Sequence, residues 1–265
     1  MKKLINKKWI GLILCLSLLL ALLAGCDTDR IGGSLSSLDE DDTPTKSTAS
    51  QKETEDEEEE GTPNAGVSEE DPTEEAENKS YLGRMEGGIY ENAYAGYGCK
   101  LDTSWTFYTA EELQELPEDV AELFEGSDVG DSISKYTQIT DMMAENTKAL
   151  TSINVLYQKL DATARLAFVG LDEEAVIDEV MKQSESMKTA YAQAGIEVIS
   201  FEKVTVTFLG EEHTALLMSS TMQGVPYYTL QMMDYSLGQY SVTLTLASFQ
   251  ENTTEALLDL FYTVN

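Results

Sequence analysis

The clearest pattern in this sequence is the alternation of apolar and polar residues near its C-terminus. Tyr240, Val242 and Leu244 alternate with serine and threonine, which is the period of a half-buried strand. Three similar runs precede this one, and glycine-containing segments separate the runs at hairpin distances. The four runs cover residues 197–208, 214–222, 227–235 and 240–249. We therefore expect a four-stranded antiparallel meander.

A helical pattern comes directly before the meander. Asp172 is suited to cap a first helical turn, and Gly195 stands where a helix would end. The apolar positions between them recur mostly at helical spacing: Val176, Val180, Met187, Tyr191 and Ala194. This spacing predicts one long helix over residues 172–194 that packs one face on a sheet.

Shorter elements are expected before this helix. Residues 89–92 and 97–102 are strand candidates, and Gly96 and Gly98 mark a tight turn or a bulge between or within them. Two further strand candidates suit a hairpin, and one segment suits helical turns interrupted by Pro117. These segments are residues 139–144 and 152–160 for the hairpin and 109–124 for the helical turns.

The chain should close with a helix. Asn252 and Glu255 are three residues apart, which resembles a capping box. Leu257, Leu258 and Phe261 would give this C-terminal helix an apolar face. The elements together predict an α+β fold, in which an antiparallel sheet is flanked by a long helix and a C-terminal helix.

The first 25 residues have the layout of a secretory signal. Four lysines precede an apolar run over residues 9–22, which would rise only ~21 Å as a helix and so is short of the ~30 Å hydrocarbon core. The segment Leu23-Ala24-Gly25-Cys26 follows and is similar at all four positions to the lipobox of bacterial lipoproteins. The resemblance implies lipid attachment to Cys26, cleavage before Cys26, and anchoring by acyl chains on the extracytoplasmic face of the cell membrane.

Residues 27–80 carry 19 acidic and 4 basic side chains and no aromatic residue. Such a segment cannot bury enough apolar surface to offset chain entropy, so we expect disorder. The glutamates at 57–60 could be read as a calcium site, but they lack the alternation and the glycine of a calcium loop. The sequence thus divides into a signal peptide (1–25), a lipidated cysteine with a disordered acidic linker (26–80) and one globular domain (81–265).

Charge and composition exclude several functions. The 265 residues include 48 acidic and 17 basic side chains, for a net charge of −31, which argues against nucleic-acid binding because that affinity depends on Lys and Arg. A single histidine and three cysteines leave no cluster for zinc, and no phosphate-binding glycine loop is present. We expect no cofactor and no metal. All 13 tyrosines lie in residues 81–265, so that segment holds the core.

The folded segment also resembles a family, the proteins with the Mog1 and PsbP fold. The resemblance rests on Tyr90-Glu91-Asn92 leading to an aromatic strand and Trp105, on the single helix before the meander, and on the ending from Gly238-Gln239-Tyr240 to Phe261. It implies an α/β/α sandwich over residues 88–264 that acts as a binding or accessory module. No functional residue is carried over from it.

Catalytic candidates are few. His213 is the only possible imidazole base and is expected in a loop, and Cys99 has no nucleophile signature around it, so a buried strand residue is favoured there. A pair of carboxylates for glycoside hydrolysis stays open, because acids are abundant.

Aromatic and methionine pairs offer a second set of candidates. Trp105 with Phe107 and Tyr108, or one of Tyr227 and Tyr228, could line a binding groove, although packing in the core is favoured. The methionine pairs at 142–143 and 232–233 are expected to fill the core.

The leading hypothesis is a lipid-anchored protein with a non-catalytic domain that binds a ligand or a protein partner outside the cytoplasm. The alternatives are an envelope glycan hydrolase with two carboxylates and an assembly factor for a membrane complex. Cys26 is the one residue to which the sequence assigns a role, that of lipidation site.

Overall fold

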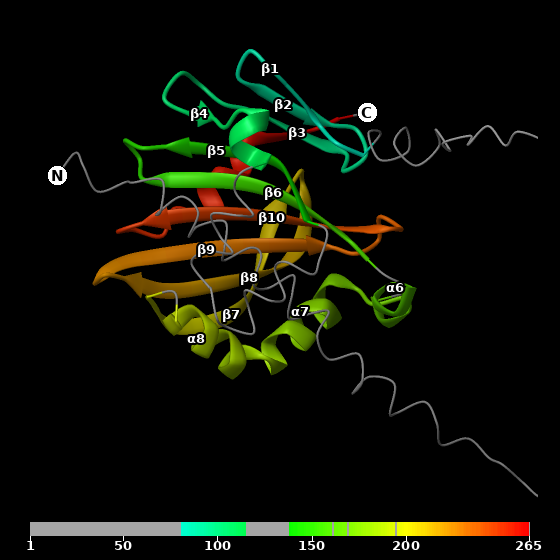
Figure 1. The fold of residues 1–265 in the computed structure, drawn as a ribbon, viewed down its shortest axis with the longest axis vertical. Coiled ribbons are helices and arrows are strands. Elements are labelled where there is room, and N and C mark those ends of the chain that lie inside the picture. Colours follow the sequence, from blue (N-terminus) through cyan, green and yellow to red (C-terminus); the bar gives the residue numbers. More distant parts are fainter. Residues whose placement is uncertain (1–80, 115–137, 161, 169, 194, 265) are drawn as a thin grey trace, which may run out of the picture.

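The computed structural model describes residues 81–114, 138–160, 162–168, 170–193 and 195–264. Within them the chain forms two antiparallel sheets and several helices, with more residues in strands than in helices (Figure 1). The domain is therefore α+β, as the sequence predicts. The signal peptide and the acidic linker lie outside the described residues. No helix in the described part is both long and apolar enough to span a bilayer.

The larger sheet has seven strands in the order β4-β5-β6-β10-β9-β8-β7. They are β4 (Thr106–Phe107), β5 (Gln138–Asn146), β6 (Thr151–Lys159), β7 (Ile196–Phe208), β8 (Glu211–Met222), β9 (Val225–Asp234) and β10 (Tyr240–Phe249). Strands β7 to β10 pair in succession, which confirms the predicted meander. The predicted hairpin is also confirmed, and its strand β6 pairs with β10 so that the two units form one sheet.

Two tight turns of the meander have a left-handed backbone at both central residues. Leu209 and Gly210 have φ angles of 54° and 88°, and Gln223 and Gly224 have 51° and 78°. Positive φ at both positions defines a type I′ turn, whose twist matches that of the paired strands. The glycines that mark these hairpins in the sequence are therefore needed for the backbone conformation of the turn.

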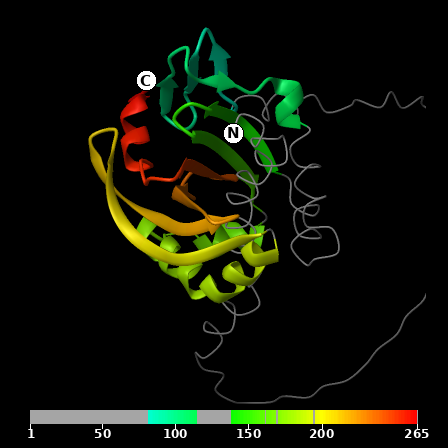
Figure 2. The ribbon, with the colours of Figure 1, turned by 90° about the vertical axis from the view of Figure 1, so that its left-hand side faces the viewer.

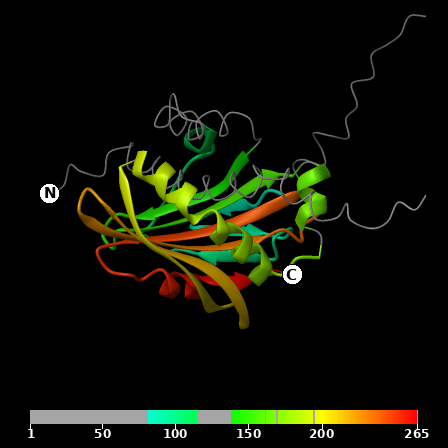
Figure 3. The ribbon, with the colours of Figure 1, turned by 90° about the horizontal axis from the view of Figure 1, so that it is seen from below.

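The helical segment before the meander differs from the prediction. It is divided at Gln183 into α7 (Glu173–Lys182) and α8 (Ser184–Gln193). Asp172 caps α7 as expected, with its side chain accepting a hydrogen bond from the Ala175 N–H at 2.8 Å. On the two sides of this break, α7 packs mainly on β8 and α8 packs on β7, and both lie along the same face of the large sheet (Figure 3).

The smaller sheet has the order β1-β2-β3-β11 and faces the opposite side of the large sheet from α7 and α8 (Figure 2). Its strands are β1 (Arg84–Glu86), β2 (Ile89–Asn92), β3 (Tyr97–Lys100) and β11 (Phe261–Thr263). The prediction of strands at 89–92 and 97–102 is thus confirmed, whereas β1, β4 and β11 are too short to stand out in the sequence. Gly98 lies inside β3, where a Cβ would come within 2.6 Å of the Tyr90 carbonyl oxygen.

A C-terminal helix forms where the sequence predicts one and buries Leu257 and Leu258, but it is not an α-helix. The segment is a 3-10 helix, η2 (Glu255–Leu260), which leads directly into β11. Thr254 precedes it without a side-chain cap, because the Asn252 side chain accepts from the Thr254 N–H and hydroxyl, and the expected capping box does not form. The capping box that does form joins Thr109 and Glu112 at the helical turn 110–114; the remainder of the helical segment predicted over 109–124 lies outside the described residues. Another helix, α6 (Ala162–Phe168), had no counterpart in the prediction.

The large sheet separates two hydrophobic cores. One lies under α7 and α8, and the other lies between the two sheets. Met142 and Met143 are consecutive on β5, fully buried, and belong to different cores. Met232 and Met233 on β9 are divided in the same way. These methionines fill core space, as expected from the sequence, and their positions show that helices and small sheet cover opposite faces.

A buried carboxylate joins the small sheet to the large one. Asp141 lies in β5, where the pairing with β6 shifts between Thr140 and Met142. This β-bulge turns the Asp141 side chain toward the small sheet, on the same side as its neighbour Met142. The carboxylate accepts hydrogen bonds from the Gly83 N–H at 2.9 Å, the Tyr90 hydroxyl at 2.6 Å and the Asn92 amide at 2.8 Å. All these donors belong to β2 or to the segment before β1.

Close packing around Asp141 explains why position 83 is a glycine. A Cβ at Gly83 would lie 2.4 Å from the Tyr90 ring and 2.9 Å from a backbone oxygen. Only glycine therefore lets the backbone N–H at this position reach the carboxylate. The Asn92 side chain extends the network by donating also to the Tyr157 hydroxyl and the Tyr81 carbonyl, both at 2.9 Å.

Replacing Asp141 by asparagine should destabilise the domain. Gly83, Tyr90 and Asn92 all donate to the carboxylate, and an amide offers only one acceptor and brings a competing N–H₂ group. We expect Asp141→Asn to lower the free energy of unfolding by about 1–3 kcal/mol at pH 7 in urea titrations. The matched control is Asp259→Asn at an exposed position, which should change it by less than about 0.5 kcal/mol.

The stability of the wild type and that of Asp141→Asn should depend differently on pH. Burial raises the pKa of the Asp141 carboxyl group, and its hydrogen bonds oppose that shift only in part. Folding therefore favours the protonated form, and the contribution of Asp141 to stability is lost as the pH rises through its folded pKa. The wild type should gain stability relative to Asp141→Asn as the pH falls from 7 toward 3. An unfolding free-energy difference that shrinks over that range would contradict this assignment.

Candidate functional site

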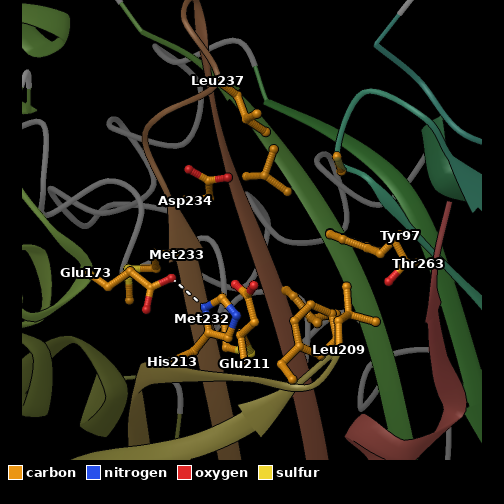
Figure 4. A pocket seen from close by; sticks show the side chains of 14 residues that line it. Tyr97, Glu173, Leu209, Glu211, His213, Met232, Met233, Asp234, Leu237 and Thr263 are labelled. Atoms are coloured by element: carbon orange, nitrogen blue, oxygen red, sulfur yellow. Dashed lines mark hydrogen bonds and ion pairs between the residues drawn. The ribbon is translucent and has the colours of Figure 1, made fainter. Parts of the chain in front are cut away.

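A pocket of about 320 Å³ opens where one end of the large sheet meets the small sheet (Figure 4). The turn between β7 and β8, the end of β9 and the start of β10 form one side of it. Ala95, Tyr97 and Thr263 form the other side and come from the small sheet or the turn that enters it. The pocket is therefore built from segments far apart in the sequence, and it depends on how the two sheets are docked.

The floor of the pocket is apolar. Val242 and Leu244 of β10 are buried in the core between the sheets, and Met232 of β9 packs beside them. Phe208 and Leu209 complete the apolar lining from the end of β7 and the type I′ turn. A ligand that enters this pocket can therefore bury an apolar group of small size.

The rim of the pocket is acidic. Glu173, Glu211 and Asp234 line it, and no lysine or arginine is among its lining residues. Asp234 is the last residue of β9, and one oxygen of its carboxylate accepts the Ser236 N–H at 2.7 Å. Glu211 is the first residue of β8, and its carboxylate takes no hydrogen bond or ion pair from the described residues.

Glu173 differs from the other rim acids because both its oxygens are used. One oxygen lies 2.7 Å from Nδ1 of His213, and the other accepts the Thr214 N–H at 2.9 Å. Glu173 is the first residue of α7, where a carboxylate also suits the positive end of the helix dipole. These contacts fix the start of α7 to β8. They also correct the prediction for His213, which lies within strand β8 opposite Val206 and not in a loop.

Tyr97 contributes a polar group that has no partner. The residue is 7% exposed, and its hydroxyl makes no hydrogen bond. Its side chain extends from β3 toward the pocket (Figure 4) and packs edge-on against Phe208 and Phe261. Burial raises the pKa of the Tyr97 phenol, and the carboxylates of Asp141 and Asp234 raise it further, so the hydroxyl stays protonated at neutral pH.

The other residues singled out in the sequence belong to the core. Cys99 is fully buried in β3, and burial raises the pKa of its thiol to about 12, so it is not a nucleophile. Trp105 and Phe107 pack against the core between the sheets, while Tyr108 packs against the helix-side core, so the three do not line one groove. Tyr227 is buried and Tyr228 is half-buried on the opposite face, as the alternation predicts.

The described residues show no arrangement that is typical of catalysis. Burial raises the pKa of the carboxyl groups of Asp141 and Glu145, as a general acid would require, yet neither lines the pocket. Nowhere in the described part do three or more His, Cys, Asp or Glu side chains gather closely enough to hold a metal ion. Cys26 lies outside the described residues.

The pocket was not predicted, because none of its lining residues stands out from its neighbours in the sequence. Glu211 and Asp234 stand at strand ends in a chain with acidic residues almost everywhere, so neither is distinguished by spacing. Tyr97 reads as one of many strand tyrosines. The signal that could have pointed to this end of the sheet is the Phe208-Leu209-Gly210-Glu211 segment, where a bulky apolar residue occupies a tight turn.

Comparisons with known proteins add little to this description. No protein-family model matches the chain, and no curated protein sequence matches it. Among solved structures, the solution structure of cyanobacterial PsbP (CyanoP) from Synechocystis sp. PCC 6803 is similar with a TM-score of 0.36 and 12% identity. The match covers 68% of this chain and 98% of that chain. It is a weak resemblance in fold and assigns no site.

Proposed function

We propose that this protein is a membrane-anchored extracytoplasmic lipoprotein whose globular domain binds a small ligand without transforming it. The observation that carries the binding function is the pocket between the sheets, which has an apolar floor and an acidic rim. Such a combination of apolar surface with a few polar groups is characteristic of ligand sites. The lining supplies neither a reactive thiol nor a serine or lysine that could act as a nucleophile.

The glycan-hydrolase alternative fits the pocket less well. Sugars present many hydroxyl groups, whereas most of the described lining residues are apolar, and the polar ones are Tyr97, Thr263, His213 and three carboxylates. Glu173 is already engaged by His213 and Thr214. Glu211 and Asp234 would have to provide the acid and the base above a floor made of Met, Val, Leu and Phe side chains. We therefore favour binding over hydrolysis.

The location rests on the lipobox-like segment and the linker. Two or three acyl chains on Cys26 would anchor the chain stably, because each buried methylene contributes about 0.8 kcal/mol. The 54 residues from 27 to 80 would span roughly 40 Å as a flexible coil, and repulsion between their acidic side chains would lengthen that span. The binding domain would thus be held away from the membrane surface.

The anchor is tested by replacing single cysteines. Cys26→Ser should abolish incorporation of radiolabelled fatty acid and should move the protein to the soluble fraction or leave an uncleaved precursor. Cys15→Ser is the matched control, because Cys15 lies in the apolar run of the signal segment, and this variant should be labelled and membrane-bound like the wild type. Fatty-acid labelling that persists in Cys26→Ser would refute the anchor.

The pocket is tested by filling it. Met232→Trp and Leu237→Trp place a large ring in the pocket from two different sides, and Ile199→Trp adds the same ring on an exposed face of β7. The chain from residue 27 onward should bind the neutral fluorescent probe Prodan saturably, and each pocket variant should weaken that binding at least tenfold, as measured by fluorescence titration. Ile199→Trp should bind like the wild type. If both pocket variants remain folded and bind the probe normally, the pocket is not the site.

A further inference from the structure

We propose that the pocket selects an organic cation, specifically a primary ammonium group carried on a short apolar chain. The inference rests on the proposed binding function and specifies its ligand class. The apolar floor accepts the chain, and the acidic rim together with the Tyr97 hydroxyl accepts the ammonium group. A pocket of about 320 Å³ is at the small end of the range for ligand sites, so it suits a chain of a few carbons.

The first observation is the charge balance of the rim. Both oxygens of Glu173 are engaged by Nδ1 of His213 and the Thr214 N–H, which leaves Glu211 and Asp234 as the lining carboxylates without an ion pair among the described residues. Among the lining residues in the described part of the chain, none is a lysine or arginine that could neutralise them. The domain around it, residues 81–265, carries 29 acidic and 9 basic side chains, so the surrounding field also favours a cation.

The second observation is independent of the acidic residues. The Tyr97 hydroxyl is buried and has no hydrogen-bond partner, although a buried polar group without a partner costs about 1–3 kcal/mol. Buried polar groups in native proteins are almost always paired, and among the residues with such unpaired atoms Tyr97 is the one that lines the pocket, so a donor bound there would pair it. An ammonium N–H can donate to the phenol oxygen of Tyr97, which the phenol's raised pKa keeps in its neutral form.

A metal ion does not explain the site as well. Across the described parts of the chain, no group of three His, Cys, Asp or Glu side chains converges as metal ligands. Two carboxylates and a phenol above an apolar floor do not supply the six to eight oxygen ligands that calcium takes. An ammonium group needs only three acceptors, and its apolar chain accounts for the floor.

The decisive comparison uses three probes of equal length. Hexylammonium, hexanol and hexanoate each have six carbons and carry a cationic, a neutral and an anionic head group, respectively. Each is titrated against Prodan bound to the chain from residue 27 onward. We expect hexylammonium to displace Prodan at a concentration at least tenfold lower than hexanol, and hexanoate to be the weakest. The preference should shrink as the salt concentration rises, because part of it comes from partly exposed charges.

Matched variants assign the preference to the rim. The double variant Glu211→Gln and Asp234→Asn should remove most of the preference for hexylammonium over hexanol, and Tyr97→Phe should reduce it about threefold while hexanol binds as before. Glu212→Gln is the control, since Glu212 is the exposed neighbour of Glu211 and does not line the pocket. It should keep the wild-type preference.

The outcomes separate the two proposals. If Prodan binds in the pocket but hexylammonium is no better than hexanol, the cation inference is wrong and the binding function stands. If neither Prodan nor any six-carbon probe binds, both are wrong. A peptide with one internal lysine, compared with the same peptide carrying norleucine, identifies the source of the ammonium group: stronger displacement by the lysine peptide than by hexylammonium indicates a protein ligand, and weaker displacement indicates a free amine.

Discussion

The carboxylate of Asp141 is the interaction on which the rest of this structure depends. It lies at a bulge of the large sheet and accepts hydrogen bonds from Gly83, Tyr90 and Asn92, which all belong to the first strands of the small sheet or to the segment that leads into them. A buried carboxylate is costly unless its acceptors are filled, and here neutral donors fill them without a cation. The small sheet is therefore held in one orientation, and Tyr97 and Thr263 reach the pocket because of it.

The sequence predicts those elements of the fold that depend on residues close together in the chain. Alternation and turn glycines predict the meander and the hairpin, and Asp172 predicts the start of α7. The break at Gln183 was not predictable, because neither a glycine nor a proline marks it in the sequence. The same holds for the C-terminus, where Phe261 leaves the helix to pair with Cys99, a residue far away in the chain. The pocket joins residues 95 to 263, so no local pattern reveals it.

In the folded domain, the acidic side chains differ in what they contact. A net charge of −31 argues against nucleic acid as a partner but does not distinguish one carboxylate from another. The structure separates them by what they contact. Asp141 accepts neutral donors in the core, Glu173 is paired with His213, and Glu211 and Asp234 stand at the mouth of an apolar pocket. Only the last two are available to a ligand, and they favour a cationic one.

The most direct test of whether an organic cation binds in the pocket uses the methionine methyl groups as reporters in NMR spectra. Met232 and Met233 line the pocket, whereas Met187 and Met218, which share the helix-side core with Met233, do not. With ¹³C-labelled methionine methyl groups in the chain from residue 27 onward, addition of hexylammonium should shift the Met232 and Met233 signals and leave those of Met187 and Met218 in place. Saturable shifts confined to Met187 and Met218, or no saturable shift at all, would contradict the account.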